Sequence, residues 1–257
     1  MRQTKIITVA LAAACAATMG VSAANVRATV LAGWNFYSSM NGSGTTSDGS
    51  VATVAATTVD SSVTTTAISR GSGMATAVMA GNFAHTGAMN ANQPGNSNLA
   101  AAETANSYFQ FTVTPTSTVS LSDLSFYAYQ QNTNSPTGVG VLYSLDGFSS
   151  SGSYAGGSSA NLGGDYQGTS YSVSLAGLSS LQNDSSPITF RIFLWGVGGY
   201  QDRGLGQVPS ATAATTNDVE LDGTAGSGPS IPEPATLGLM AVLGTGLLLV
   251  GRKRKVA

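Results

Sequence analysis

The middle of the chain alternates apolar and polar residues over short runs, and this period of two constrains its fold more than any other feature. In one run, Phe109, Phe111 and Val113 fall on the same face. Clusters of Gly, Ser and Asn separate this run from similar ones at residues 119–129, 139–143, 171–175, 188–194 and 219–221. No amphipathic helical pattern exceeds two turns, so short strands joined by tight turns are expected. The sequence therefore predicts an all-β fold, an antiparallel β-sandwich or jelly-roll-like domain.

Three segments of this region carry more specific expectations. Residues 187–195 have apolar side chains on both faces near the end of the run, which predicts a central strand. Asp146 and Gly147 follow a strand pattern and predict a hairpin turn. Within residues 38–105, the stretch 53–67 is rich in Val and Thr and could form strands, whereas 74–102 is small, polar and Asn-rich, with few core candidates. We interpret 38–105 as irregular or long-loop structure.

Charged residues make up 9% of the chain, against about 25% in ordinary soluble domains, and they are segregated along it. All twelve acidic residues lie between Asp48 and Glu233, whereas six of the ten basic residues lie at the two ends. Removal of residues 1–23 and 235–257 leaves four basic and twelve acidic residues, a net charge of −8. Such a product cannot neutralise phosphates, which argues against nucleic acid as a partner. It is compatible with solubility or with divalent cations.

Residues 1–23 have the layout of a secretory signal peptide. Arg2 and Lys5 precede an apolar, Ala-rich run, and small residues lead to an expected cleavage after Ala23. A buried N-terminal helix and a lipoprotein signal built on Cys15 are the alternatives. Cys15 is the only cysteine, so cleavage leaves no disulfide, no thiol nucleophile and no cysteine-based metal site.

Residues 231–257 carry three features in order. The tripeptide Pro232-Glu233-Pro234 is expected to be extended, because the two prolines remove backbone donors and block a helix. The apolar segment 235–251 holds no charge and, as a helix, spans about 25 Å, close to the thickness of a bilayer core. The cluster Arg252-Lys253-Arg254-Lys255 follows, and the positive-inside rule keeps it cytoplasmic. A single C-terminal transmembrane helix is predicted.

Together these C-terminal features resemble the sorting tail of PEP-CTERM proteins, the substrates of the exosortase system in Gram-negative bacteria. The resemblance covers residues 231–257 and implies processing by an exosortase, a membrane-embedded, cysteine-dependent, transpeptidase-like enzyme. With signal peptidase acting at the other end, residues 24–230 become a Ser-, Thr- and Gly-rich passenger domain. That domain is expected at the cell surface or in the extracellular matrix. Residues 218–223 also look similar to the last strand of such passengers, which closes a jelly-roll-like sandwich.

Ionisable residues give few candidates for chemistry. His85 is the only histidine and is interpreted as a loop residue. Asp218, Glu220 and Asp222 alternate along an expected strand, so their carboxylates are predicted to share one face. They form either a calcium site or the solvated outer face of an edge strand, and we favour the second interpretation. No pair of carboxylates is singled out as a glycosidase pair.

Aromatic residues supply the other candidates. Trp195 and Tyr200 flank a glycine-rich stretch and could stack on sugar rings, or they could pack inward against Phe193 and Leu205. Trp34, in contrast, falls within an expected first strand and is interpreted as core.

Three classes of function stay open from the sequence. The leading hypothesis is a structural protein of the cell surface or matrix, and the second is a carbohydrate-binding module that contacts extracellular polysaccharide. A polysaccharide hydrolase is the third and least favoured class. Because no catalytic constellation is recognisable, we predict a non-enzymatic protein without a cofactor.

Overall fold

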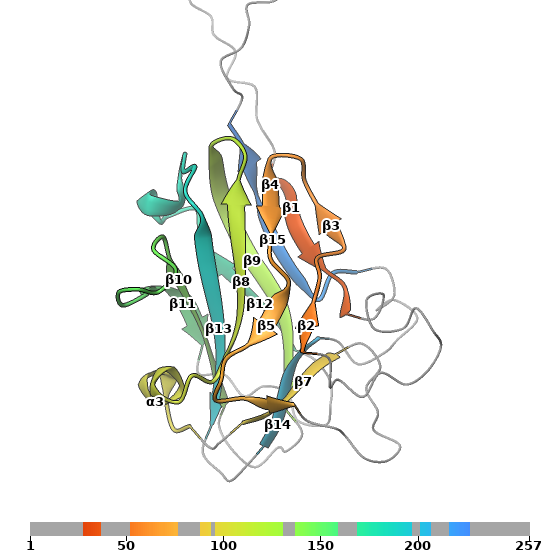
Figure 1. Ribbon diagram of the computed structural model, residues 1–257, viewed down its shortest axis with the longest axis vertical. Coiled ribbons are helices and arrows are strands. Elements are labelled where there is room, and N and C mark those ends of the chain that lie inside the picture. Colours follow the sequence, from red (N-terminus) through yellow and green to blue (C-terminus); the bar gives the residue numbers. More distant parts are fainter. Residues whose placement is uncertain are drawn as a thin grey trace, which may run out of the picture.

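The computed structural model describes residues 28–36, 52–76, 88–93, 96–130, 137–158, 169–196, 201–206 and 216–226. In these residues, strands form two antiparallel sheets that pack face to face (Figure 1). The predicted all-β sandwich is therefore confirmed for the described part of the chain. Both the signal peptide 1–23 and the sorting tail 231–257 lie outside it.

The first sheet, here called sheet I, is built around the long strand β9. Its strands run in the order β3-β1-β15-β9-β14-β7-β6, and β12 pairs with β9 as well. Their bounds are β1 Thr29–Trp34, β3 Thr58–Val59, β6 Ala75–Thr76, β7 Ala88–Gln93, β9 Val119–Gln130, β12 Thr169–Ser174, β14 Gln201–Gly206 and β15 Val219–Ala225.

The second sheet, sheet II, is built around β13 and β8. Its strands run in the order β11-β10-β13-β8-β5-β2, with β4 also paired to β8. Their bounds are β2 Thr53–Val54, β4 Val63–Thr65, β5 Ile68–Arg70, β8 Tyr108–Pro115, β10 Thr137–Ser144, β11 Ser153–Ser158 and β13 Ile188–Gly196.

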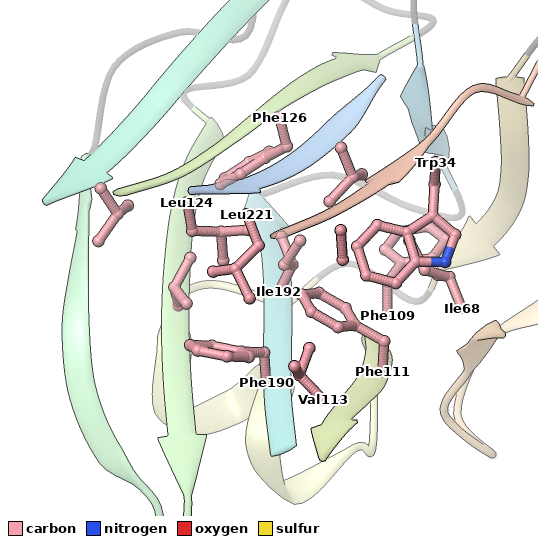
Figure 2. Packing of buried hydrophobic residues seen from close by; sticks show 14 of the residues in the cluster. Trp34, Ile68, Phe109, Phe111, Val113, Leu124, Phe126, Phe190, Ile192 and Leu221 are labelled. Atoms are coloured by element: carbon pink, nitrogen blue, oxygen red, sulfur yellow. The ribbon is translucent and has the colours of Figure 1, made fainter. Parts of the chain in front are cut away.

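The core lies between the sheets and is centred on a row of aromatic rings (Figure 2). Trp34 of sheet I approaches Phe111 of sheet II with ring centroids 4.5 Å apart. Phe111 in turn stacks on Phe190 of the neighbouring strand, at 5.3 Å. All three rings are buried, and such pairs add about 0.5–1.5 kcal/mol to the free energy gained by burial alone. The alternation along β8 and β13 therefore supplies the contact that joins the layers.

The expected central strand is confirmed as β13, which pairs with β10 on one side and β8 on the other. Its second apolar face is covered by the short helix α3, Leu99–Thr104, which buries Ala102 against Phe193. Asn98 caps this helix, because its side-chain oxygen accepts a hydrogen bond from Ala101 N at 2.9 Å. The apolar residues on both faces of β13 thus face two different clusters.

Residues 53–67, whose sequence allows strands, hold β2, β3 and β4, whereas the interpretation of the rest of 38–105 as irregular is wrong for its described parts. Residues 53–76 form five short strands, and α3 lies within the stretch that was expected to lack regular structure. The strands β2, β4 and β5 have two or three residues and bury one side chain each, namely Val54, Val63 and Ile68. Strands of this length are too short to display a period of two in the sequence. Their order comes from pairing: β4 and β5 pair with β8, and β2 pairs with β5.

The predicted turn at Asp146 and Gly147 is confirmed between β10 and β11. Gly147 has a φ of 69°, which glycine adopts without strain. Asp146 accepts hydrogen bonds from the hydroxyls of Ser144 at 2.5 Å and Ser150 at 2.6 Å. These bonds, the one from Ser144 first, lower the pKa of Asp146 to about 2.

The first and the last described strands lie side by side. In the pairing of β1 with β15, Thr29 lies opposite Gly223 and Trp34 lies opposite Val219. β15 also pairs with β9 on its other side, so it is an interior strand. The start of β1 and the end of β15 therefore lie next to each other (Figure 1).

We predict that Phe190→Ala lowers the free energy of unfolding by about 3–5 kcal/mol, because the ring is fully buried between the sheets. Chemical denaturation of the purified protein measures the loss. Tyr154→Ala is the control, since Tyr154 is 55% exposed and its removal should change stability by no more than about 0.5 kcal/mol. Equal losses in the two variants would contradict the assigned core.

Candidate functional site

Trp195 lies on the outer face of sheet II, at the end of β13. Its indole covers the backbone of β10, where a methyl group at Gly138 would come within 2.2 Å of the indole Cε2. The same addition at Gly140 would come within 2.9 Å of Cζ3. Only glycine leaves room for the ring at these positions, and the ring stays partly exposed. The indole of Trp195 therefore packs flat over Gly138 and Gly140 of β10.

Neither of the two environments expected for Trp195 describes its packing fully. The ring packs in a small cluster that includes Phe193 and Leu99, as the inward interpretation proposed for Phe193. Leu205, however, is buried in the other cluster, between the sheets. Trp195 is therefore a partly buried residue of an outer surface, held from below by the sheet and at its edge by α3.

An arginine between two aromatic rings belongs to the same outer face. The guanidinium carbon of Arg191 lies 4.1 Å from the ring centre of Tyr108 and 3.9 Å from that of Phe148. Its Nε donates a hydrogen bond to the side-chain oxygen of Gln110 at 2.7 Å. The pKa of Arg191 is lowered, because the effect of burial exceeds the opposing effects of Tyr108 and Glu103. These contacts fix the loop that carries Phe148 against the sheet.

The three carboxylates predicted to share a face do not do so. Asp218 is buried, and its Oδ2 accepts a hydrogen bond from the backbone N of Phe36 at 2.7 Å. It precedes β15, so the alternation of the strand does not apply to it. Glu220 and Asp222 do lie on the outer face of sheet I, where Asp123 of β9 stands opposite Asp222. The strand that carries them is interior, which corrects the edge-strand interpretation.

Within the described ranges, no group of three Asp, Glu, His or Cys side chains lies close enough together to hold a metal ion. The pKa of Asp222 is nevertheless raised, first by burial and then by the negative charges of Glu220 and Asp123. The carboxylates of this face therefore repel one another when ionised.

A hollow of about 350 Å³ opens on this outer face of sheet I. It lies where β9 changes partner, because β15 pairs with β9 up to Phe126 and β14 pairs with it from Ala128 onward. Between them the backbone N of Tyr127 donates to the carbonyl of Asp218 at 2.9 Å. The lining is mainly polar and comes from β9, β12, β15 and the segment that leads into β15: Ser125, Tyr127, Ser170, Thr216, Asn217 and Glu220.

An amide–carboxylate pair gives this hollow a fixed polar wall. Asn217 Nδ2 donates a hydrogen bond to Glu220 Oε2 at 2.7 Å. Asn217 lies against Gly33 of β1, where a methyl group would come within 2.3 Å of its Nδ2. Gly33 thus leaves the space that the amide occupies, and both side chains are only partly exposed.

Sequence reasoning correctly placed Glu220 and Asp222 on one face but wrongly added Asp218, and it missed the other residues of the hollow. Ser125, Ser170 and Asn217 lie on segments that are far apart in the chain, and no spacing in the sequence connects them. The remaining predicted site residues lie outside the described residues: Tyr200, His85, the tripeptide Pro232-Glu233-Pro234 and the cluster Arg252-Lys253-Arg254-Lys255.

Comparison with known proteins adds little to these observations. No family model matches the chain, and no curated protein matches it either. Among solved structures, TmCBM61 in complex with β-1,4-galactotriose is similar over 63% of this chain and 88% of that chain. The sequence identity is 9% and the TM-score is 0.27, and at this score the match has no bearing on function.

The raised pKa of Asp222 predicts how stability depends on pH. The folded state disfavours the ionised carboxylate, so stability is lost as the pH rises from the ordinary Asp pKa of about 4 through the folded value. Asp222→Asn removes this penalty, and we expect a higher melting temperature than the wild type at pH 7. The difference should shrink toward zero below about pH 4.

Asp146→Asn is the matched control, because its lowered pKa gives the opposite sign. Ionised Asp146 stabilises the folded state above the ordinary Asp pKa, so this variant should melt below the wild type at pH 7. The gap should close as the pH falls toward about 2. Melting curves of both variants from acid to neutral pH provide the measurement, and shifts of the same sign would contradict the two assignments.

Proposed function

We propose that the protein is exported and becomes a structural component of the cell surface or extracellular matrix after a membrane-anchored stage. The supporting features are the predicted signal peptide 1–23 and the C-terminal sequence 231–257, which resembles a PEP-CTERM tail. An exosortase removes that tail at or near the tripeptide Pro232-Glu233-Pro234. Within the described residues, no helix is long and apolar enough to cross a membrane, and the proposed anchor 235–251 lies outside them.

The observation that carries this proposal is the position of the sandwich between the two processing sites. The described strands begin at Thr29, just after the expected cleavage at Ala23, and end at Ala225, just before Pro232. Cleavage at both sites therefore leaves every described strand intact. The jelly-roll-like closure of the passenger by its last strand is part of the same proposal.

Residues 226–234 set how far the sandwich can stand from the membrane. Fully extended, they reach about 30 Å from the end of β15 to the start of the anchor 235–251. We expect Pro232 and Pro234 to favour an extended backbone over a helix in this strip, which is the form that a processing enzyme can bind.

The proposal predicts the mass of the mature protein. Intact-mass measurement on material released from the cell surface should show loss of residues 1–23 and of the residues that follow the Pro232-Glu233-Pro234 region. A released species that still carries 252–255 would be inconsistent with processing of the tail.

A variant with the cluster Arg252-Lys253-Arg254-Lys255 replaced by neutral residues is the control for orientation. It should be retained poorly in the inner membrane and processed less, because the charges that stop transfer are absent. Normal retention and processing would show that the cluster has no stop-transfer role.

Carbohydrate binding is the second candidate function, and Trp195 is the observation that favours it. The indole is held over Gly138 and Gly140 and stays partly exposed, so it offers a fixed ring surface without a large conformational cost. Aromatic rings of this kind stack on the apolar face of a pyranose. Extracellular polysaccharide is the proposed ligand, and such a site needs neither a cofactor nor a catalytic residue.

Tryptophan fluorescence tests this second candidate, because the chain has two tryptophans and Trp34 is fully buried. We expect a soluble quencher to act on Trp195 alone, and added polysaccharide to shift its emission and protect it. Affinity in the millimolar to high micromolar range, about 4–6 kcal/mol, is expected for one ring. The variant Trp195→Phe isolates the signal of Trp34, and a Trp195 signal that ignores polysaccharide would exclude the stacking site.

A further inference from the structure

We infer that the hollow on the outer face of sheet I binds one neutral pyranose unit of a polysaccharide. This inference goes beyond the proposed function, because it concerns the opposite sheet from Trp195 and a separate set of residues. It rests on the lining, shape and charge of the hollow.

The lining combines one ring with several hydrogen-bonding groups. Tyr127 presents a partly exposed phenol, and Ser125, Ser170 and Thr216 contribute hydroxyls. A pyranose has the matching composition, because its C–H face is apolar and its edge carries hydroxyls that both donate and accept. A purely apolar ligand would cover the hydroxyls of Ser125 and Ser170 without offering them hydrogen bonds, which disfavours that class.

The pair of Asn217 and Glu220 is positioned in advance of any ligand. Their hydrogen bond of 2.7 Å and the space left by Gly33 hold both side chains in place. A carboxylate accepts from sugar hydroxyls, and an amide can both donate and accept. A wall that is already ordered loses little conformational entropy when it binds.

The size of the hollow indicates a small contact. Its volume of about 350 Å³ is near the lower end of the range of about 300–1,000 Å³ found for small-molecule sites. It is also open to solvent, so neighbouring units of a chain can continue outside it. One sugar unit in the hollow, with the polymer running across the face of sheet I, is consistent with these dimensions.

Charge selects among saccharides. Glu220 lies in the hollow, and Asp123 and Asp222 lie on the same outer face. A uronic acid or a sulfated sugar would bring a further negative charge to this surface, which is unfavourable. A neutral sugar avoids that repulsion, so the site should discriminate against acidic polysaccharides.

Calorimetric titration of the full-length chain tests the site. The protein is held in a zwitterionic detergent without a sugar head group and titrated with neutral trisaccharides of glucose, galactose and mannose, and with trigalacturonate. At least one neutral trisaccharide should bind in the millimolar to high micromolar range, and trigalacturonate should bind at least about tenfold more weakly. Absence of binding by all the neutral sugars would overturn the inference.

Four variants locate the binding. Tyr127→Ala and Glu220→Gln should each weaken it about tenfold or more, whereas Tyr127→Phe keeps the ring and should retain most of the affinity. Asp222→Asn is the matched control, because it removes the same charge from the same face but does not line the hollow. Melting temperatures establish that each variant is folded.

Two further results would overturn the assignment to this hollow. Equal weakening by Asp222→Asn and Glu220→Gln would indicate a general charge effect instead of a site. Binding that survives Tyr127→Ala but is lost in Trp195→Ala would place the sugar on sheet II, so the hollow would be excluded while the proposed carbohydrate function would stand.

Discussion

The contact between Trp34, Phe111 and Phe190 is the interaction on which the sandwich depends, because it joins the two sheets through their aromatic rings. The chain has one cysteine, Cys15, so no disulfide can take over this task. Every other feature follows from where these inward side chains place the strands. Once Phe111 and Phe190 face inward, Gln110 and Arg191 must face outward, and the outer surfaces are set.

The two outer faces then differ because different elements lie on them. On sheet II, α3 covers Phe193 and leaves Trp195 partly exposed beside it. On sheet I, small hydroxyl side chains and carboxylates remain at the surface, and the change of partner along β9 opens a hollow among them. A single strand order thus produces one surface based on an aromatic ring and another based on polar groups.

Much of the fold could be predicted from the sequence, because strands such as β8 and β13 are long enough to show alternation. The bounds and partners of the short strands between 53 and 76 could not, since β2, β4 and β5 each bury only one side chain and β3 buries none. Helix α3 was missed for a similar reason, because its six residues are too few to show a helical period.

The candidate site was less accessible to sequence reasoning than the fold. Trp195 was found because a large ring near glycines is visible in the sequence, although the glycines that support it, Gly138 and Gly140, lie on another strand. Asp218 precedes β15 by one residue, so strand alternation does not predict its direction, and its carboxylate accepts a hydrogen bond from the backbone N of Phe36. Contacts of this kind depend on which strands become neighbours, and local patterns do not specify that.

The place of β15 in sheet I has a consequence for the order in which the sandwich can assemble. In the proposed export, as in synthesis, the chain emerges from its N-terminus, so β1 and β9 are available before β15, the strand that pairs with both. Until β15 is available, the facing edges of β1 and β9 lack their final backbone partners, and such edges invite pairing with other chains. A chain that stops before Val219 therefore leaves two strand edges unpaired at once. The last strand thus protects β1 and β9 from pairing with other chains.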